Sequence, residues 1–151
     1  MMARIETSVT IARPQRAVFE YLTDLRNAKE WSTEVVDVTY DGQLGKGTTG
    51  SDIRRFGRKE MVMPWKVVSF ASPDGMTIQY ERPFPMTAEF SFQDLGGATR
   101  VSCSTDLMPR GWWRLLSPVL SLEGKKADRV QFEKVKAILE GTNGNGAKNE
   151  R

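Results

Sequence analysis

Apolar and polar residues alternate along most of the chain, and this alternation predicts strands. Ile5, Thr7, Val9 and Ile11 alternate with charged or polar residues, as in a strand with one buried, mostly apolar face. The segment after the glycine-rich stretch 42–50 has no helical apolar stripe, so it is also interpreted as a strand. The remaining predicted strands cover residues 33–40, 60–70, 76–81, 88–93 and 99–107.

Two short helices are predicted between the first two strands. Pro14 suits the first turn of a helix over residues 14–24, in which apolar residues recur at helical spacing. Residues 27–31 form a second, shorter helix, and Trp31 within it is expected to be buried.

The longest predicted helix, residues 117–140, follows the last strand. Ser117 can act as its N-cap, Pro118 as its first helical residue and Gly141 as its stop. At 1.5 Å per residue the helix would span about 36 Å, roughly the width of a small domain. A helix of that length needs a surface to lie on.

This helix has two apolar sides rather than one. The first consists of Phe132, Val135 and Leu139, and the second of Ala127, Val130, Ala137 and Ile138. Two apolar sides fit a helix held by a curved sheet better than one lying on a flat surface. We expect the Phe132 side, with Leu120 or Leu122 nearer the mouth, to cover a cavity, and Gly124 to bend the helix.

The order of elements predicts an α+β fold. Six successive strands joined by tight turns form an antiparallel meander, and the first strand joins the same sheet at an edge. A seven-stranded sheet twists and curls, so its concave face can hold the long helix. We expect residues 1–140 to form a single domain and the Gly/Asn-rich tail 141–151 to be disordered.

Composition narrows the chemistry. The 151 residues include no histidine and one cysteine, which excludes histidine-based catalysis and internal disulfides and argues against a zinc site. Neither a metal nor a cofactor is predicted, so any catalysis would depend on carboxylates, Arg, Lys, Tyr or water. A lone cysteine, Cys103, suits a reducing compartment, and the N-terminus lacks a signal-peptide pattern, so a cytoplasmic location is expected.

Charge and hydropathy exclude two further classes. The net charge of +3 is dispersed in pairs of basic residues, which does not suggest a nucleic-acid-binding protein. No apolar run approaches the roughly 20 residues that a membrane span needs. The pattern Gly45-x-Gly47-x-x-Gly50 matches a dinucleotide fingerprint, but no helix is predicted after it, so it is interpreted as a turn between strands.

The segment 13–35 has a pattern known from other proteins. Its Pro14, Val18, Phe19, Asp24 and Trp31 are placed as in the polyketide cyclase/dehydrase-like branch of the START-like, or SRPBCC, superfamily, which the chain resembles. The resemblance covers nearly all of residues 3–140 and extends to the glycine loop 42–50, Trp65–Phe70, Gly97–Val101 and Pro109-x-Gly111.

This resemblance implies a helix-grip fold similar to that of the birch pollen allergen. Such a fold holds a cavity for hydrophobic small molecules between the sheet and the C-terminal helix. Members include binding proteins, carriers, hormone receptors and aromatising cyclases, so the resemblance implies the fold more strongly than the function.

Aromatic residues are plentiful and could line such a cavity, although the same rings could instead fill the core. The residues expected to line a ligand cavity are Leu22, Trp31, Ile53, Trp65, Tyr80, Arg82, Phe90, Trp112, Phe132 and Val135.

Tyr80 and Arg82 are the polar candidates in this set, and the only candidates for catalysis. On a strand they would share the concave face with Met76 and Ile78. Arg82 could pair with a ligand carboxylate or enolate, and Tyr80 could donate a hydrogen bond or act as an acid. Alternatively, both lie at the rim of the sheet, with Arg82 in solvent.

The carboxylates of the strand region are expected on the solvent-facing side; they are Asp52, Glu60, Glu81 and Glu89. Cys103 is interpreted as a small buried hydrophobe. The segment 110–116 mixes aromatic and aliphatic residues with two arginines. It could lie in a membrane interface, cover the cavity mouth or simply lead into the helix; because it is short, membrane docking is the least favoured of the three.

Three functional hypotheses follow. The first is a binding or carrier protein for a hydrophobic or aromatic small molecule, lipid-like or polyketide-like. The second is a cyclase/dehydrase-type enzyme that uses Tyr80, Arg82 or ordered water. The third is a protein or membrane interaction module. An apolar pocket favours the first, a buried polar-lined pocket the second, and a filled interior with exposed Trp112 and Trp113 the third.

Overall fold

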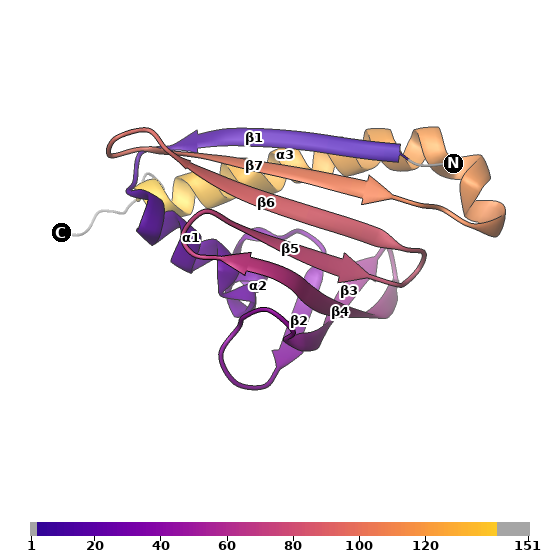
Figure 1. Ribbon diagram of the computed structural model, residues 1–151. Coiled ribbons are helices and arrows are strands. Elements are labelled where there is room, and N and C mark those ends of the chain that lie inside the picture. Colours follow the sequence, from indigo (N-terminus) through magenta and orange to yellow (C-terminus); the bar gives the residue numbers. More distant parts are fainter. Residues whose placement is uncertain (1–2, 142–151) are drawn as a thin grey trace.

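Seven antiparallel strands form one open sheet that curls around a long C-terminal helix (Figure 1). The computed structural model describes residues 3–141, except for the side chains of Ser117, Leu120, Ser121 and Glu123. The strands are β1 (Ala3–Ile11), β2 (Val35–Tyr40), β3 (Thr49–Phe56), β4 (Lys59–Ala71), β5 (Gly75–Tyr80), β6 (Met86–Asp94) and β7 (Thr99–Leu107). The helices are α1 (Gln15–Thr23), η1 (Leu25–Asn27), α2 (Ala28–Trp31), η2 (Gly111–Leu116) and α3 (Ser117–Glu140). The predicted α+β architecture is confirmed.

The strand order is β1-β7-β6-β5-β4-β3-β2, so the meander is closed at one edge by the first strand. β1 pairs with β7 along its whole length, from Ala3 opposite Leu107 to Ile11 opposite Thr99. An ion pair of 2.7 Å between Arg4 and Asp106 reinforces the pairing on the outer face. The first strand therefore occupies the edge that the sequence predicted for it.

One end of the concave face is filled by α1. The Phe19 ring packs edge-on against Phe70, at 5.4 Å between ring centroids, and against Phe92, at 5.1 Å. Phe132 and Val135 of α3 belong to the same buried cluster. This packing closes one end of the curved sheet, while η2 and the start of α3 lie at the other end (Figure 1).

A second buried cluster lies on β4 and β5 around Trp65. The Trp65 ring packs edge-on against Tyr40 at 5.6 Å and lies across Gly50 of β3. A Cβ atom on Gly50 would come within 2.6 Å of this ring and within 2.5 Å of the Thr39 carbonyl oxygen. The third glycine of the apparent dinucleotide motif is therefore needed for a close approach inside the sheet, and β3 rather than a helix follows the loop.

The long helix agrees with its predicted limits but not with every detail. Its first residue is Ser117, so Leu116 occupies the N-cap position, and it ends at Gly141, which adopts a left-handed conformation (φ 67°). Gly124 lies against Ile5 of β1, where a Cβ would come within 2.5 Å of the Ile5 side chain. Gly124 therefore lets the helix approach the edge strand closely.

The apolar sides of α3 are corrected in part. Phe132 and Val135 are buried as expected, but Leu122 and Val130 are exposed. The expectation that Leu122 covers the cavity is wrong, because the first turns of α3 extend past the sheet edge and leave this side chain in solvent. The expectations for Leu120 and for residues 142–151 lie outside the described residues.

Substitution of Gly50 tests the close approach of Trp65. We expect Gly50→Ala to lower the free energy of unfolding by about 1–3 kcal/mol, because the added methyl group meets a backbone oxygen and a packed ring. Gly45→Ala is the matched control, since no atom lies within 4 Å of its added Cβ. Equal stability of the two variants in denaturant unfolding would contradict the packing described.

Candidate functional site

An internal cavity of about 860 Å³ lies between the concave face of the sheet and the helices α2, η2 and α3. Methionine and phenylalanine side chains from β4 and β6 supply much of its apolar wall, among them Met63, Met86 and Phe90. The interior is therefore not filled, in contrast to the core around Phe19.

Six of the ten residues expected to line a cavity do so; they are Leu22, Trp31, Tyr80, Phe90, Trp112 and Phe132. Ile53, Trp65, Arg82 and Val135 do not, each for its own reason.

The alternation of β3 places Asp52 and Arg54 on the concave face, so Ile53 lies on the other face. Trp65 is buried in the core beneath Gly50. Arg82 is exposed, because β5 ends at Tyr80 and the alternation of the strand no longer applies.

Val135 belongs to the other end of the molecule. It is fully buried in the cluster around α1, about one helical turn beyond Phe132. It therefore supports the wall without facing the cavity.

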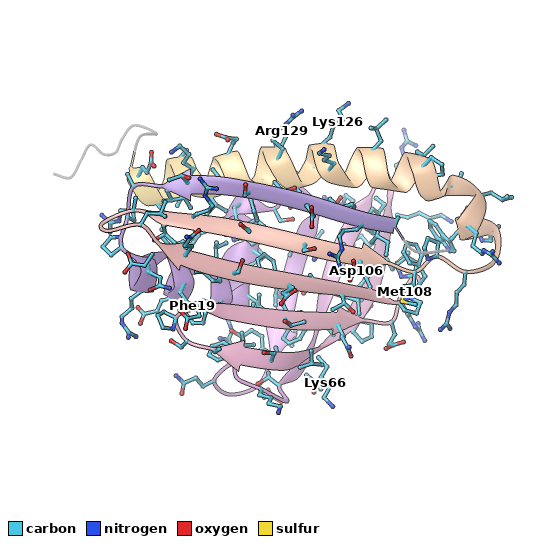
Figure 2. The ribbon with its side chains drawn as sticks, turned by 45° about the horizontal axis from the view of Figure 1, so that its top comes forward. Phe19, Lys66, Asp106, Met108, Lys126 and Arg129 are labelled. Carbon is cyan, nitrogen blue, oxygen red and sulfur yellow. The ribbon has the colours of Figure 1, made fainter. Side chains whose placement is uncertain are left out.

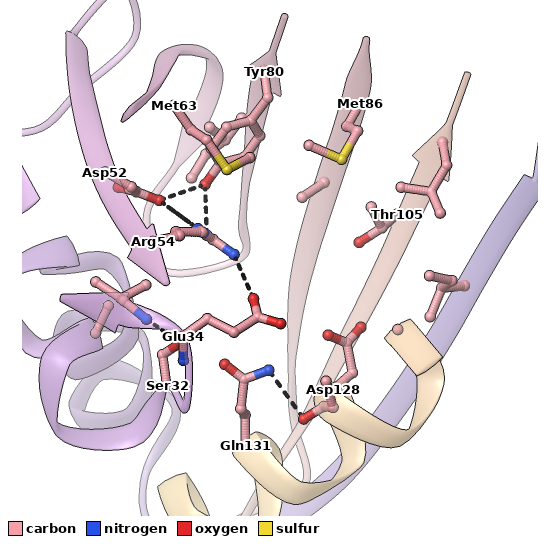
Figure 3. Close-up of a pocket in the computed structure, with 18 of the residues that line it drawn as sticks. Ser32, Glu34, Asp52, Arg54, Met63, Tyr80, Met86, Thr105, Asp128 and Gln131 are labelled. Carbon is pink, nitrogen blue, oxygen red and sulfur yellow. Dashed lines mark hydrogen bonds and ion pairs between the residues drawn. The ribbon is translucent and has the colours of Figure 1, made fainter. Parts of the chain in front are cut away.

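A polar network crosses one side of the cavity, and Asp52 is at its centre (Figure 3). One carboxylate oxygen accepts a hydrogen bond from Trp65 Nε1 at 2.8 Å. The other accepts from the Arg54 guanidinium at 2.9 Å and from the Tyr80 hydroxyl at 3.3 Å. Asp52 thus links β3, β4 and β5 through side chains as well as through the sheet.

Arg54 extends this network towards the helices. Its Nη2 also donates to the Tyr80 hydroxyl at 3.3 Å, and its Nη1 pairs with Glu34 at 3.3 Å. Glu34 lies between Arg54 and the α3 residues Asp128 and Gln131 (Figure 3). A single guanidinium is therefore shared by two carboxylates, while Asp128 faces the same space.

Of the network residues that line the cavity, the sequence predicted only Tyr80 as a cavity residue. The expectation that Asp52 lies in solvent is wrong, because the residue is only 4% exposed. The alternation of Asp52, Ile53 and Arg54 holds a usable signal: opposite charges two residues apart on a strand share a face and can pair. Glu34 and Asp128 carry no such signal, since only the fold brings them together.

Burial changes the titration of the cavity groups. Removal from water, reinforced by the charge of Glu34, raises the pKa of Asp128 from its usual 3.8 to about 6. Burial also raises the pKa of Tyr80 above its usual value, although the Arg54 charge opposes this. At neutral pH Tyr80 is therefore a hydrogen-bond donor, and Asp128 is close to its own titration.

Burial by itself would lower the pKa of Arg54. Its neighbours Tyr80, Asp52 and Glu34 more than compensate, so the pKa of Arg54 is raised and its charge is retained. The network therefore holds a permanent cation.

Trp31 of α2 also lines the cavity. The Trp31 indole nitrogen is buried, and no hydrogen-bond partner for it is found among the described residues. Within residues 3–141, no three potential ligands of the types His, Cys, Asp and Glu are grouped as a metal site would require.

Comparison with known proteins agrees with this geometry. The family model described as "Polyketide cyclase / dehydrase and lipid transport" matches residues 2–140. The chain belongs to this family. No curated protein matches the chain in a sequence search.

Solved structures of other proteins share the fold. TTHA0849 from Thermus thermophilus has a TM-score of 0.76 and 13% identity, covering 93% of this chain and 99% of that one. Ara h 8.0201 has a TM-score of 0.74 and 11% identity, with coverage of 92% and 98%. The Zhui aromatase/cyclase from Streptomyces sp. R1128 has a TM-score of 0.70 and 14% identity, with coverage of 91% and 96%. At these identities the likeness establishes the helix-grip fold alone.

Replacement of Asp128 tests its burial. Since the folded-state pKa is raised, charging this carboxyl costs stability as pH rises from about 4 to 6. We expect Asp128→Asn to raise the free energy of unfolding by about 2–3 kcal/mol at pH 7.5. The gain should shrink as pH falls from 6 to 4 and vanish below about pH 3, where the aspartic acid is protonated in both states.

Denaturant unfolding across this pH range measures the effect. Asp41→Asn, in the exposed loop after β2, is the control and should show no comparable change. A gain from Asp128→Asn that does not vary with pH would show that the carboxyl is solvated.

Proposed function

We propose that the protein binds or carries a hydrophobic or aromatic small molecule, lipid-like or polyketide-like, in the cavity. The observation that carries the proposal is the cavity itself: about 860 Å³ of space with apolar walls and one polar side. Pockets for small molecules combine these features, with apolar surface for affinity and a few polar groups for orientation. The single, buried cysteine Cys103 suits a reducing, cytoplasmic setting for this role.

The polar side constrains the ligand. Arg54 already serves Asp52, Glu34 and Tyr80, so a ligand carboxylate would meet more negative than positive charge. A neutral oxygen, such as a carbonyl or hydroxyl, carries no such repulsion. The unpartnered Trp31 indole N–H would be satisfied by the same kind of acceptor. We therefore favour a neutral, apolar ligand bearing at least one oxygen, and we do not retain a ligand carboxylate paired with Arg82.

Filling the cavity tests this function. Ala88 of β6 lines the cavity, so Ala88→Trp should occupy ligand space and weaken binding of the neutral fluorescent probe N-phenyl-1-naphthylamine by about tenfold or more. Ala71→Trp, at the exposed end of β4, is the matched control and should bind as the parent protein does.

Two results would overturn the proposal. One is probe binding that is equal in both variants. The other is the absence of probe binding in the parent protein, together with no apolar compound released by denaturing extraction and detected by mass spectrometry.

A cyclase/dehydrase-type activity is the second candidate, and Asp128 favours it. A general acid or base works best when its pKa lies near the working pH, and this carboxyl has a pKa of about 6. Asp128 would exchange a proton with a ligand carbon next to a carbonyl, while Tyr80 and Arg54 donate hydrogen bonds to the oxygen that gains charge. Tyr80 keeps the role expected from the sequence, and Arg54 replaces Arg82.

One variant, Asp128→Asn, distinguishes the enzyme function from the binding function. If the protein is an enzyme, Asp128→Asn should abolish turnover of its substrate while leaving probe affinity within about twofold of the parent value. Unchanged turnover would remove Asp128 from the mechanism and leave the binding function standing.

A further inference from the structure

Large apolar side chains are exposed at one end of the molecule. Trp112, Leu115 and Leu116 of η2 are 62%, 83% and 36% exposed, and Val119 and Leu122 of α3 are 55% and 65% exposed. These five residues, here called the apolar tip, occupy one continuous stretch of the chain. Large apolar side chains that are exposed as a group are typical of interaction surfaces.

The tip is anchored from within. The Trp112 ring stacks on Trp113 at 4.3 Å between centroids, and Trp113 packs against Phe84 at 5.5 Å. The inner tryptophan is thus fixed to the connection between β5 and β6, while the outer one faces solvent. The position of Trp112 in the tip is therefore fixed by ring packing against the rest of the fold.

Positive charge surrounds the tip. Arg110, Arg114, Lys125 and Lys126 are all exposed, and Glu123 is the only acidic residue between positions 108 and 126. Lys126 projects from the outer side of α3 (Figure 2).

The neighbouring strand connections hold three further cations, beside the exposed acidic residues Glu60 and Glu81. Arg58 lies between β3 and β4, Lys59 begins β4, and Arg82 lies between β5 and β6. The antiparallel register brings these connections to the end of the sheet where β7 finishes, next to η2. Arg82, for which the sequence left a cavity position and a rim position open, is exposed and belongs to this basic rim.

The tip also borders the cavity. Trp112 and Trp113 line it from η2, and Lys59 and Pro83 line it from the strand connections. Figure 1 shows η2 and the start of α3 beyond the ends of β1 and β7, on the side where these connections meet. A surface that receives the tip would therefore lie against the mouth of the cavity.

We propose that the apolar tip docks on an anionic lipid bilayer and places the cavity mouth in the headgroup region. The apolar side chains would enter the interface, and the surrounding cations would pair with lipid phosphates. Contact would be peripheral: among the described residues no helix is both long and apolar enough to span a bilayer. An apolar ligand could then enter or leave the cavity without crossing water. Docking does not depend on a ligand being bound and goes beyond the proposed binding function.

Charge favours a membrane over a second copy of the chain. Two tips placed face to face would bring two sets of exposed arginines and lysines together, and like charges at that distance repel. A bilayer of anionic lipid complements both the apolar and the basic parts of the surface.

Co-sedimentation with vesicles tests the proposal. The parent protein should bind vesicles of phosphatidylcholine mixed with phosphatidylglycerol, bind phosphatidylcholine alone much more weakly, and lose binding as salt is raised. Leu115→Ser combined with Leu122→Ser should weaken binding by about tenfold or more, because both side chains would enter the interface. Leu95→Ser is the matched control, since Leu95 is 43% exposed in the connection between β6 and β7 at the opposite end of the sheet.

A second pair of variants tests the charge. Lys125→Gln combined with Lys126→Gln should weaken binding to the mixed vesicles by about tenfold and leave the weak binding to phosphatidylcholine unchanged. Lys66→Gln, on the far side of the molecule from Lys126 (Figure 2), should have little effect. All of these side chains are exposed, so the variants should keep the parent melting temperature.

Several outcomes would overturn the inference. They are absent vesicle binding, equal binding by the tip variants and their controls, or a tip that instead holds a dimer, seen as a monomer–dimer change with Leu115→Ser in sedimentation. Binding of N-phenyl-1-naphthylamine separates the two proposals: its loss with vesicle binding intact removes the cavity function alone, and the reverse removes docking alone.

Discussion

The polar side of the cavity depends on the hydrogen bonds that the buried carboxylate of Asp52 accepts. Removing a charge from water costs several kcal/mol, and Asp52 offsets this with donors from β3, β4 and β5. Those donors keep three neighbouring side chains in fixed orientations along the concave face. Arg54 in turn forms an ion pair with Glu34, the residue just before β2. The polar side of the cavity is therefore held together by hydrogen bonds and an ion pair within the chain.

The opposite wall explains why a cavity remains. Where α1 and α3 meet the sheet, large rings such as Phe19 and Phe132 fill the interior. About one turn earlier, α3 presents Ala127 and Asp128, which are small or polar. Small side chains on the helix cannot reach the sheet, and a curved sheet cannot flatten to meet them. The size of the cavity thus follows from which residues stand at a few positions of one helix.

The sequence predicted the fold well because periodicity reports directly on local structure. Alternation along β1 and β7, and the stop at Gly141, lead to the observed meander and long helix. The site was predicted less completely. It depends on which face of a strand each residue occupies and on contacts between residues far apart in the sequence. Ile53 and Asp52 are adjacent, so the choice of concave face reverses their roles. Arg82 was assigned by extending a strand two residues beyond its end at Tyr80.

Groups such as Glu34 and Asp128, nearly a hundred residues apart, cannot be associated from the sequence pattern alone. Their meeting depends on the crossing of the helix over the sheet, and small errors in that crossing would separate them. The same limit applies to the exposure of Leu122, which depends on how far α3 extends past the edge strand.

The pairing of β1 with β7 has a consequence for how the chain is made. Arg4 and Asp106 are separated by 102 positions, so the first strand leaves the ribosome long before its partner exists. Until then β1 presents an unpaired edge and an apolar face, the features that promote aggregation of nascent chains. Contacts so distant in sequence also slow folding. The last helix, synthesised after β7, covers the same strand, so the native edge of the sheet is completed only when nearly all of the chain is available.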